Sequence, residues 1–197
     1  MNLANKLTLF RIILVPFFVA FMLIDEIPYN YLLALIIFAV ASVTDFLDGY
    51  IARKYNMITS FGKFLDPIAD KVLVVSALVC FVELGWTGAW VVVVIIAREF
   101  IVSGIRLAAV ESEDKTVISA GFLGKLKTAV TMVVICWFLI IMTIYFDFKI
   151  NYFDISPDFN MAIVTTTSVL MYTCAFLTVI SGVQYAWQYR HVFKSKN

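Results

Sequence analysis

Charged residues and histidine are scarce in this sequence. Only 15% of its 197 residues are charged and 62% are apolar or aromatic, whereas soluble globular domains carry roughly 25% charged residues. A chain with so little polar side-chain surface is suited to lipid as its solvent. Its formal net charge is only +1, which implies no strongly charged partner and argues against nucleic acid.

The scarcity of histidine and cysteine excludes several chemistries. The single histidine, His191, lies in a polar C-terminal segment, so a Ser-His-Asp or Cys-His mechanism lacks its base. Cys80, Cys136 and Cys174 are scattered through apolar runs without a CxxC pair, which favours small buried hydrophobes over a zinc site or a disulfide framework. Any chemistry must therefore rest on carboxylates, bound metals, lysine and arginine.

Long apolar segments are what the sequence does contain. A helix that crosses a bilayer needs roughly 20 mostly apolar residues, and six segments qualify: residues 7–24, 31–50, 66–84, 86–110, 126–146 and 161–189. Arg11 lies inside the first segment, which also lacks a small-residue cleavage site, so we interpret it as a helix and not as a signal peptide. The sequence predicts an all-α, polytopic membrane protein with one domain over residues 1–197.

The charges between these segments predict an orientation. Six spans put both termini on one side. That side carries most of the basic residues, namely Lys6, Arg11, Arg53, Lys54, Lys63, Lys115, Arg190, Lys194 and Lys196. The other side carries mainly acidic ones, namely Asp25, Glu26, Glu83, Asp147, Asp154 and Asp158, with Lys149. The positive-inside rule therefore places both termini and the 50–65 loop in the cytoplasm.

Four aspartates lie at the ends of two neighbouring predicted helices. Asp45 and Asp48 are three residues apart, and Asp66 and Asp70 are four apart. These spacings place each pair on one helical face. Carboxylates that converge in a low-dielectric bundle need a counter-charge, and all-oxygen ligation favours Mg²⁺, Mn²⁺ or Ca²⁺ over zinc. Since Mg²⁺ often shares its ligand shell with substrate phosphates, a diphosphate substrate would complete the site.

Two alternatives to a metal site stay open at this point. The aspartates could cap helices or pair with basic neighbours such as Arg53, Lys54, Lys63 and Lys71. They could also belong to an ion or proton pathway, although Glu99 is the one acid deeper in a predicted span. Asp66 followed by Pro67 predicts a helix that begins at this point.

Residues 45–70 carry a recognisable motif. They read Asp45-Phe-Leu-Asp48-Gly49-Tyr-Ile-Ala-Arg53, eight residues, then Gly62-Lys-Phe-Leu-Asp66-Pro-Ile-Ala-Asp70. This segment resembles the CDP-alcohol phosphatidyltransferase motif, D-x2-D-G-x2-A-R-x8-G-x3-D-x3-D, at every fixed position. The resemblance implies the family's bundle of six transmembrane helices, usually a homodimer, with two Mg²⁺ ions for which Mn²⁺ can substitute. It also implies a short N-terminal interfacial segment at about residues 1–6 and a polar tail at about 190–197.

The resemblance also assigns roles by position. Asp45, Asp48, Asp66 and Asp70 are then metal ligands, and Asp70 is also the general base. The expected contacts to the CDP moiety are Gly49, Arg53 and Gly62, with Thr59 in the loop and Asn5, Thr8 and Arg11 near the N-terminus.

A second polar group predicts an anionic acceptor. Arg98 and Arg106 differ by about 80° around a helix, so both can face one cavity, and Lys125 and Lys127 open the fifth predicted span. Pairing of Arg98 with Glu99 is expected to be poor because adjacent helical side chains point apart. The two lysines could instead extend to the membrane surface.

The segments around these basic residues, 97–106 and 124–128, resemble bacterial phosphatidylglycerophosphate synthases, a branch of the same family. That branch transfers a phosphatidyl group from CDP-diacylglycerol to sn-glycerol 3-phosphate and releases CMP. A protein of this kind would lie in the bacterial cytoplasmic membrane, among membrane lipids, with its site facing the cytoplasm. Alternatives are a sibling enzyme that uses inositol phosphate or phosphatidylglycerol, and a cation transporter.

Overall fold

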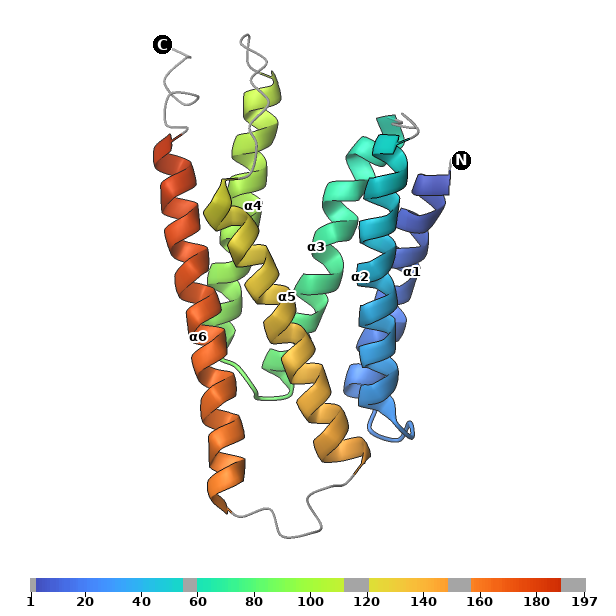
Figure 1. The fold of residues 1–197 in the computed structure, drawn as a ribbon, viewed down its shortest axis with the longest axis vertical. Coiled ribbons are helices and arrows are strands. Elements are labelled where there is room, and N and C mark those ends of the chain that lie inside the picture. Colours follow the sequence, from blue (N-terminus) through green and yellow to red (C-terminus); the bar gives the residue numbers. More distant parts are fainter. Residues whose placement is uncertain (1–2, 55–59, 112–120, 149–156, 189–197) are drawn as a thin grey trace. The chain divides into compact units, whose positions relative to one another are not determined.

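The computed structural model describes residues 3–54, 60–111, 121–148 and 157–188. Within these ranges the side chains of residues 3–5, 46–54, 60–68, 70, 106–111 and 157–160 lie outside the description. The described residues form six α-helices and one π-helical turn (Figure 1). The α-helices are α1 (Leu3–Leu23), α2 (Asn30–Lys54), α3 (Ser60–Glu83), α4 (Ala89–Glu111), α5 (Phe122–Met142) and α6 (Pro157–Gln188). The π-helical turn, η1 (Thr143–Asp147), directly follows α5. The described part of the chain contains no strand, so the all-α prediction is confirmed.

Two compact units make up the chain. One comprises residues 1–84 and 135–157, and the other comprises residues 85–134 and 158–197. Each unit draws on both halves of the sequence, and α5 contributes to both. The predicted single domain over 1–197 is not tested by this division.

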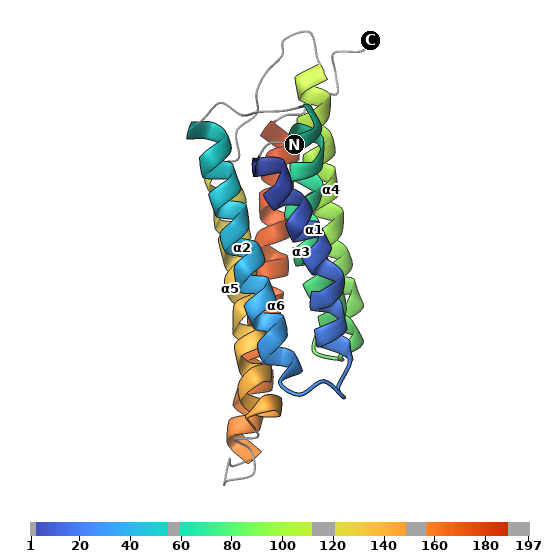
Figure 2. The same cartoon turned by 90° about the vertical axis from the view of Figure 1, so that its right-hand side faces the viewer.

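In the first unit α1 packs against α2 and α3, and α2 contacts η1 (Figures 1 and 2). Aromatic pairs fill its interior, with the Phe18 and Phe38 rings 6.0 Å apart and the Phe81 and Phe138 rings stacked at 4.3 Å. The backbone N–H of Leu32 donates a 2.6 Å hydrogen bond to Oδ2 of Asp147. An acidic side chain from η1 therefore caps a first-turn N–H group of α2, where the helix dipole favours negative charge.

In the second unit α4 and α6 lie side by side (Figure 1), with the Trp90 and Tyr172 rings stacked at 5.8 Å. The first part of α5 joins them through Thr131 and Cys174, whose Oγ1 and Sγ atoms are 3.1 Å apart. The Thr131 and Cys174 side chains are buried, whereas the Trp90 and Tyr172 rings are 60% and 54% exposed.

Three described segments are long and apolar enough to cross a membrane: Lys6–Leu23, Phe122–Asp147 and Met161–Gln188. A shorter apolar segment covers Asn30–Asp45. Each of the other three predicted spans, 31–50, 66–84 and 86–110, includes side chains outside the description. The helices are therefore confirmed, and the count of six spans stays a prediction.

One predicted helix start is wrong. Helix α3 begins at Ser60, so Asp66 and Pro67 lie inside it and do not mark its start. Ser60 is itself a residue type that favours helix N-termini, which allows the helix to begin earlier. Helix α1 already begins at Leu3, so most of the expected interfacial segment at residues 1–6 is continuous with the first helix. The tail at 190–197 lies outside the described residues.

Candidate active site

The four aspartates of the motif lie on two helices of the first unit. Asp45 and Asp48 belong to α2, and Asp66 and Asp70 belong to α3. Both segments are helical, as the predicted spacings of three and four residues require. Of the four side chains, the structure describes that of Asp45 alone.

Asp45 forms an ion pair with Arg11 from α1, with 2.5 Å between Oδ1 and Nη1. The Arg11 side chain is only 2% exposed, whereas that of Asp45 is 42% exposed. Thr8, one turn earlier on α1, is also buried. The structure thus places one end of α1 against the first aspartate of the motif. The sequence predicted Arg11 as a contact to the nucleotide, and its carboxylate partner was not foreseen.

The side chains of the remaining predicted contacts to CDP-diacylglycerol and metal lie outside the description. Thr59 lies outside the described residues. The others belong to described helices, but their side chains lie outside the description: Asn5, Asp48, Gly49, Arg53, Gly62, Asp66 and Asp70. Among the described side chains no group of three or more His, Cys, Asp or Glu could hold a metal ion. The predicted metal site therefore stays a prediction.

A second charged cluster lies in the second unit and links α4 to α5. Glu99 Oε1 accepts a 2.8 Å hydrogen bond from Arg98 Nη1 and a 2.6 Å hydrogen bond from Lys127 Nζ. The side chains are 12% (Arg98), 21% (Glu99) and 4% (Lys127) exposed. Two cations thus share one carboxylate, and we call these three residues the Glu99 cluster.

The Glu99 cluster corrects one expectation drawn from the sequence, and it bears on an alternative that was left open for the lysines. Arg98 and Glu99 do pair, because two long side chains can bend toward each other although their Cβ atoms point apart. Lys127 is buried against Glu99, which argues against the alternative of a lysine extended toward the membrane surface, whereas Lys125 is exposed. The side chain of Arg106 lies outside the description. Glu99 was not predicted as a site residue, although a lone acid inside an apolar span is itself a signal.

Arg98 packs closely on α6 as well. A Cβ atom added at Gly182 would lie 2.9 Å from Cγ of Arg98 and 3.9 Å from its Cβ. The absence of a side chain at position 182 therefore lets the arginine stem lie against the helix backbone. Nε of Arg98 is buried and has no hydrogen-bond partner among the described residues.

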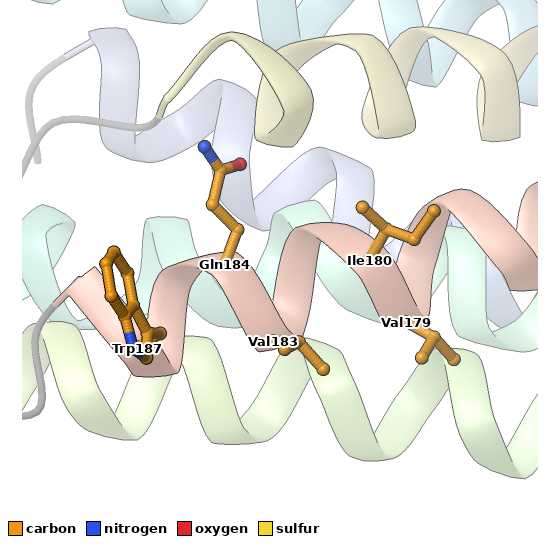
Figure 3. A pocket seen from close by; sticks show the side chains of 5 residues that line it. All are labelled: Val179, Ile180, Val183, Gln184 and Trp187. Carbon is orange, nitrogen blue, oxygen red and sulfur yellow. The ribbon is translucent and has the colours of Figure 1, made fainter.

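A shallow hollow of about 390 Å³ lies along α6 (Figure 3). Its lining consists of Val179, Ile180, Val183, Gln184 and Trp187. None of these side chains is charged, and Val183 and Trp187 are 65% and 68% exposed. An exposed apolar helix surface of this kind is typical of contact with lipid, so the hollow is not a candidate active site.

A comparison with known protein families gives a match over most of the chain. The model of the CDP-alcohol phosphatidyltransferase family matches residues 1–180. The chain therefore belongs to the CDP-alcohol phosphatidyltransferase family, and it is an integral membrane protein and a transferase.

Individual relatives are also similar to this chain over most of its length. A Bacillus subtilis (strain 168) protein named CDP-diacylglycerol–glycerol-3-phosphate 3-phosphatidyltransferase is 36% identical over 207 aligned positions, covering 100% of this chain and 99% of its own length. Proteins with the same name from Escherichia coli (strain K12) and Shigella flexneri are 40% identical over 179 positions, covering 88% of this chain and 94% of theirs.

Proposed function

We propose that this protein transfers the phosphatidyl group from CDP-diacylglycerol to sn-glycerol 3-phosphate, giving phosphatidylglycerophosphate and CMP. The observation that carries the proposal is the likeness to relatives with this named activity at 36–40% identity over 88–100% of the chain. Family membership alone would leave the acceptor alcohol open, since the motif at 45–70 concerns the CDP-linked substrate.

Metal binding belongs to the proposal. Two Mg²⁺ ions, with Mn²⁺ as a substitute, would be held by Asp45, Asp48, Asp66 and Asp70. The donor set suits a hard cation because carboxylate oxygens are its preferred ligands. Asp45 can still serve while it pairs with Arg11, because a carboxylate has about four lone-pair sites. Bound Mg²⁺ would neutralise the diphosphate and orient it.

The chemical step is a direct displacement. The Asp70 carboxylate takes the proton from the acceptor hydroxyl of glycerol 3-phosphate. The acceptor oxygen attacks the phosphorus that bears diacylglycerol, a new P–O bond forms, and the P–O bond to the CMP phosphate breaks. CMP leaves with that electron pair. Gly49, Arg53, Thr59 and Gly62 would hold the CDP moiety, together with Asn5, Thr8 and Arg11.

The acceptor's phosphate would be bound by Arg98, Arg106, Lys125 and Lys127. The Glu99 cluster supports this part of the proposal, because its two cations share a single carboxylate and so leave one net positive charge among the three. The buried Nε of Arg98 is in addition a donor without an acceptor among the described residues. Phosphate oxygens are suited to both features.

The membrane arrangement completes the proposal. Six helices would span the bacterial cytoplasmic membrane, with both termini and the active site on the cytoplasmic side and a homodimer as the working form. Acyl chains could then stay among the membrane lipids while the headgroups react at the surface.

An acceptor panel tests the function. Purified protein in mixed micelles is given CDP-diacylglycerol with glycerol 3-phosphate, inositol phosphate or phosphatidylglycerol, and CMP release and the lipid product are measured. We expect phosphatidylglycerophosphate with glycerol 3-phosphate and little product with the others. CMP release with a different acceptor would overturn the substrate assignment and keep the family, whereas no CMP release with any acceptor would refute the transferase proposal.

A further inference from the structure

We propose that Glu99 and Gly182 are positioning residues of the acceptor site, which hold Arg98 and Lys127 in the arrangement that binds the acceptor's phosphate. This inference rests on the proposed function. Neither residue would touch the substrate. Each would act through the two cations, Glu99 by charge and Gly182 by the space that it leaves.

The first step is the electrostatics of the Glu99 cluster. Arg98 and Lys127 come from different helices, and both donate to the same atom, Glu99 Oε1, at 2.8 and 2.6 Å. Both cations are largely buried, where like charges repel each other strongly because little water screens them. The carboxylate offsets this repulsion. Without it, the two cations would separate, and the pair would no longer match one phosphate group.

The second step is steric. Gly182 on α6 lies directly against the aliphatic stem of Arg98, and a methyl group at this position would be 2.9 Å from Cγ. Carbon atoms in contact normally lie roughly 3.5–4.0 Å apart, so the arginine stem would have to shift. Such a shift moves the guanidinium group without changing any charge. Arg98 is thus fixed from two sides, at its tip by Glu99 and at its stem by Gly182.

These two residues provide independent variants. Glu99→Gln keeps the shape and removes the charge, whereas Glu99→Asp keeps the charge on a shorter side chain. Gly182→Ala adds only a methyl group. Its matched control is Gly104→Ala on α4, because a Cβ atom at Gly104 meets nothing within 4 Å. Glu83→Gln, at the exposed end of α3, is the control for loss of a carboxylate.

The experiment is steady-state kinetics of the full-length protein in mixed micelles, with each substrate varied in turn, after thermal unfolding has shown that each variant is folded. For Glu99→Gln the KM for glycerol 3-phosphate should rise roughly tenfold or more, as expected when a charge-assisted contact is lost. Glu99→Asp should recover part of this loss. Gly182→Ala should raise the same KM, and both controls should leave it unchanged. The KM for CDP-diacylglycerol should change less than twofold in every variant.

Three results would overturn the inference. In a folded Glu99→Gln variant, an unchanged or lowered KM for glycerol 3-phosphate would mean that Glu99 does not position the cations. Equal increases for both substrates would indicate a structural role only. If Glu99→Gln does not fold, Gly182→Ala decides, and an unchanged KM in that variant refutes the proposal. Failure of the proposed function is recognised separately, because wild-type protein would then form no phosphatidylglycerophosphate.

Discussion

Arg11 is buried and Arg98 is largely buried in an apolar helix, and each is held by a carboxylate. The partner of Arg11 is Asp45 on the neighbouring helix, and the partner of Arg98 is the next residue in the chain. An arginine inside a bilayer costs several kcal/mol unless it is paired or used. The sequence shows that each arginine needs a partner, but it does not show which carboxylate that partner is. Helical register gives the direction of Cβ atoms, whereas these pairs depend on how long side chains bend.

The role proposed for Asp70, that of general base, has the sharpest kinetic consequence. Asp70→Asn keeps the shape of the side chain but cannot accept the proton, so turnover should fall by roughly 10²–10⁴-fold. Binding of CDP-diacylglycerol, measured by calorimetry, should be affected much less. The matched control is Asp154→Asn, which changes an aspartate outside the motif. Near-normal turnover of the Asp70→Asn variant would show that another group takes the proton.

Metal dependence is a second prediction about the same carboxylates. EDTA should abolish CMP release, and added Mg²⁺ or Mn²⁺ should restore it, because four carboxylates without a counter-charge repel one another and the diphosphate. EDTA that has been saturated with Mg²⁺ beforehand is the control for effects of the chelator itself. Full activity in a metal-free preparation would contradict the two-metal site.

At the scale of helices, the sequence predicted most of what the structure shows. All six predicted segments contain an α-helix, because a long apolar run in lipid must satisfy its backbone hydrogen bonds internally. The ends were predicted less well. The Asp66-Pro67 pair looked like a helix start, yet α3 begins at Ser60. Turn residues between the helices carry weak local signals, and they do not fix where the hydrogen-bonded ladder begins.

One helix end depends on a residue that is distant in the sequence. Asp147 in η1 accepts the N–H of Leu32 in the first turn of α2, 115 positions away. Asp147→Ala should lower the free energy of unfolding by about 0.5–2 kcal/mol, the usual cost of a lost N-terminal cap. Thermal unfolding of the purified protein measures the change. Glu26→Ala, at an exposed acid of the turn before α2, should cause a much smaller loss. Equal losses in both variants would mean that Asp147 acts only through its general negative charge.

At the scale of the whole molecule, each of the two units contains an ion-paired group inside its apolar helices. Among the described residues, the first unit has the Arg11–Asp45 pair and the second unit has the Glu99 cluster. The motif could be recognised in the sequence because the distances between its residues along the chain are fixed. All of these residues lie in two neighbouring helices. Glu99 could not be assigned in this way, since its second partner, Lys127, is 28 residues away.

The orientation in the membrane gives the last prediction. If six helices span the membrane as proposed, basic residues gather on the side of the termini and the 50–65 loop, and acidic residues gather on the other. The positive-inside rule would then place the loop in the cytoplasm, where the proposed acceptor, water-soluble glycerol 3-phosphate, would be available. Single cysteines near Asn56 and near Asp154, in a background without Cys80, Cys136 and Cys174, are treated in intact cells with a reagent that cannot cross the membrane. The reagent should label the site near Asp154 and miss the one near Asn56, and both should react once the cells are opened. Labelling near Asn56 alone in intact cells would reverse the orientation and move the active site to the outer surface, while labelling at both sites would contradict the number of spans between them.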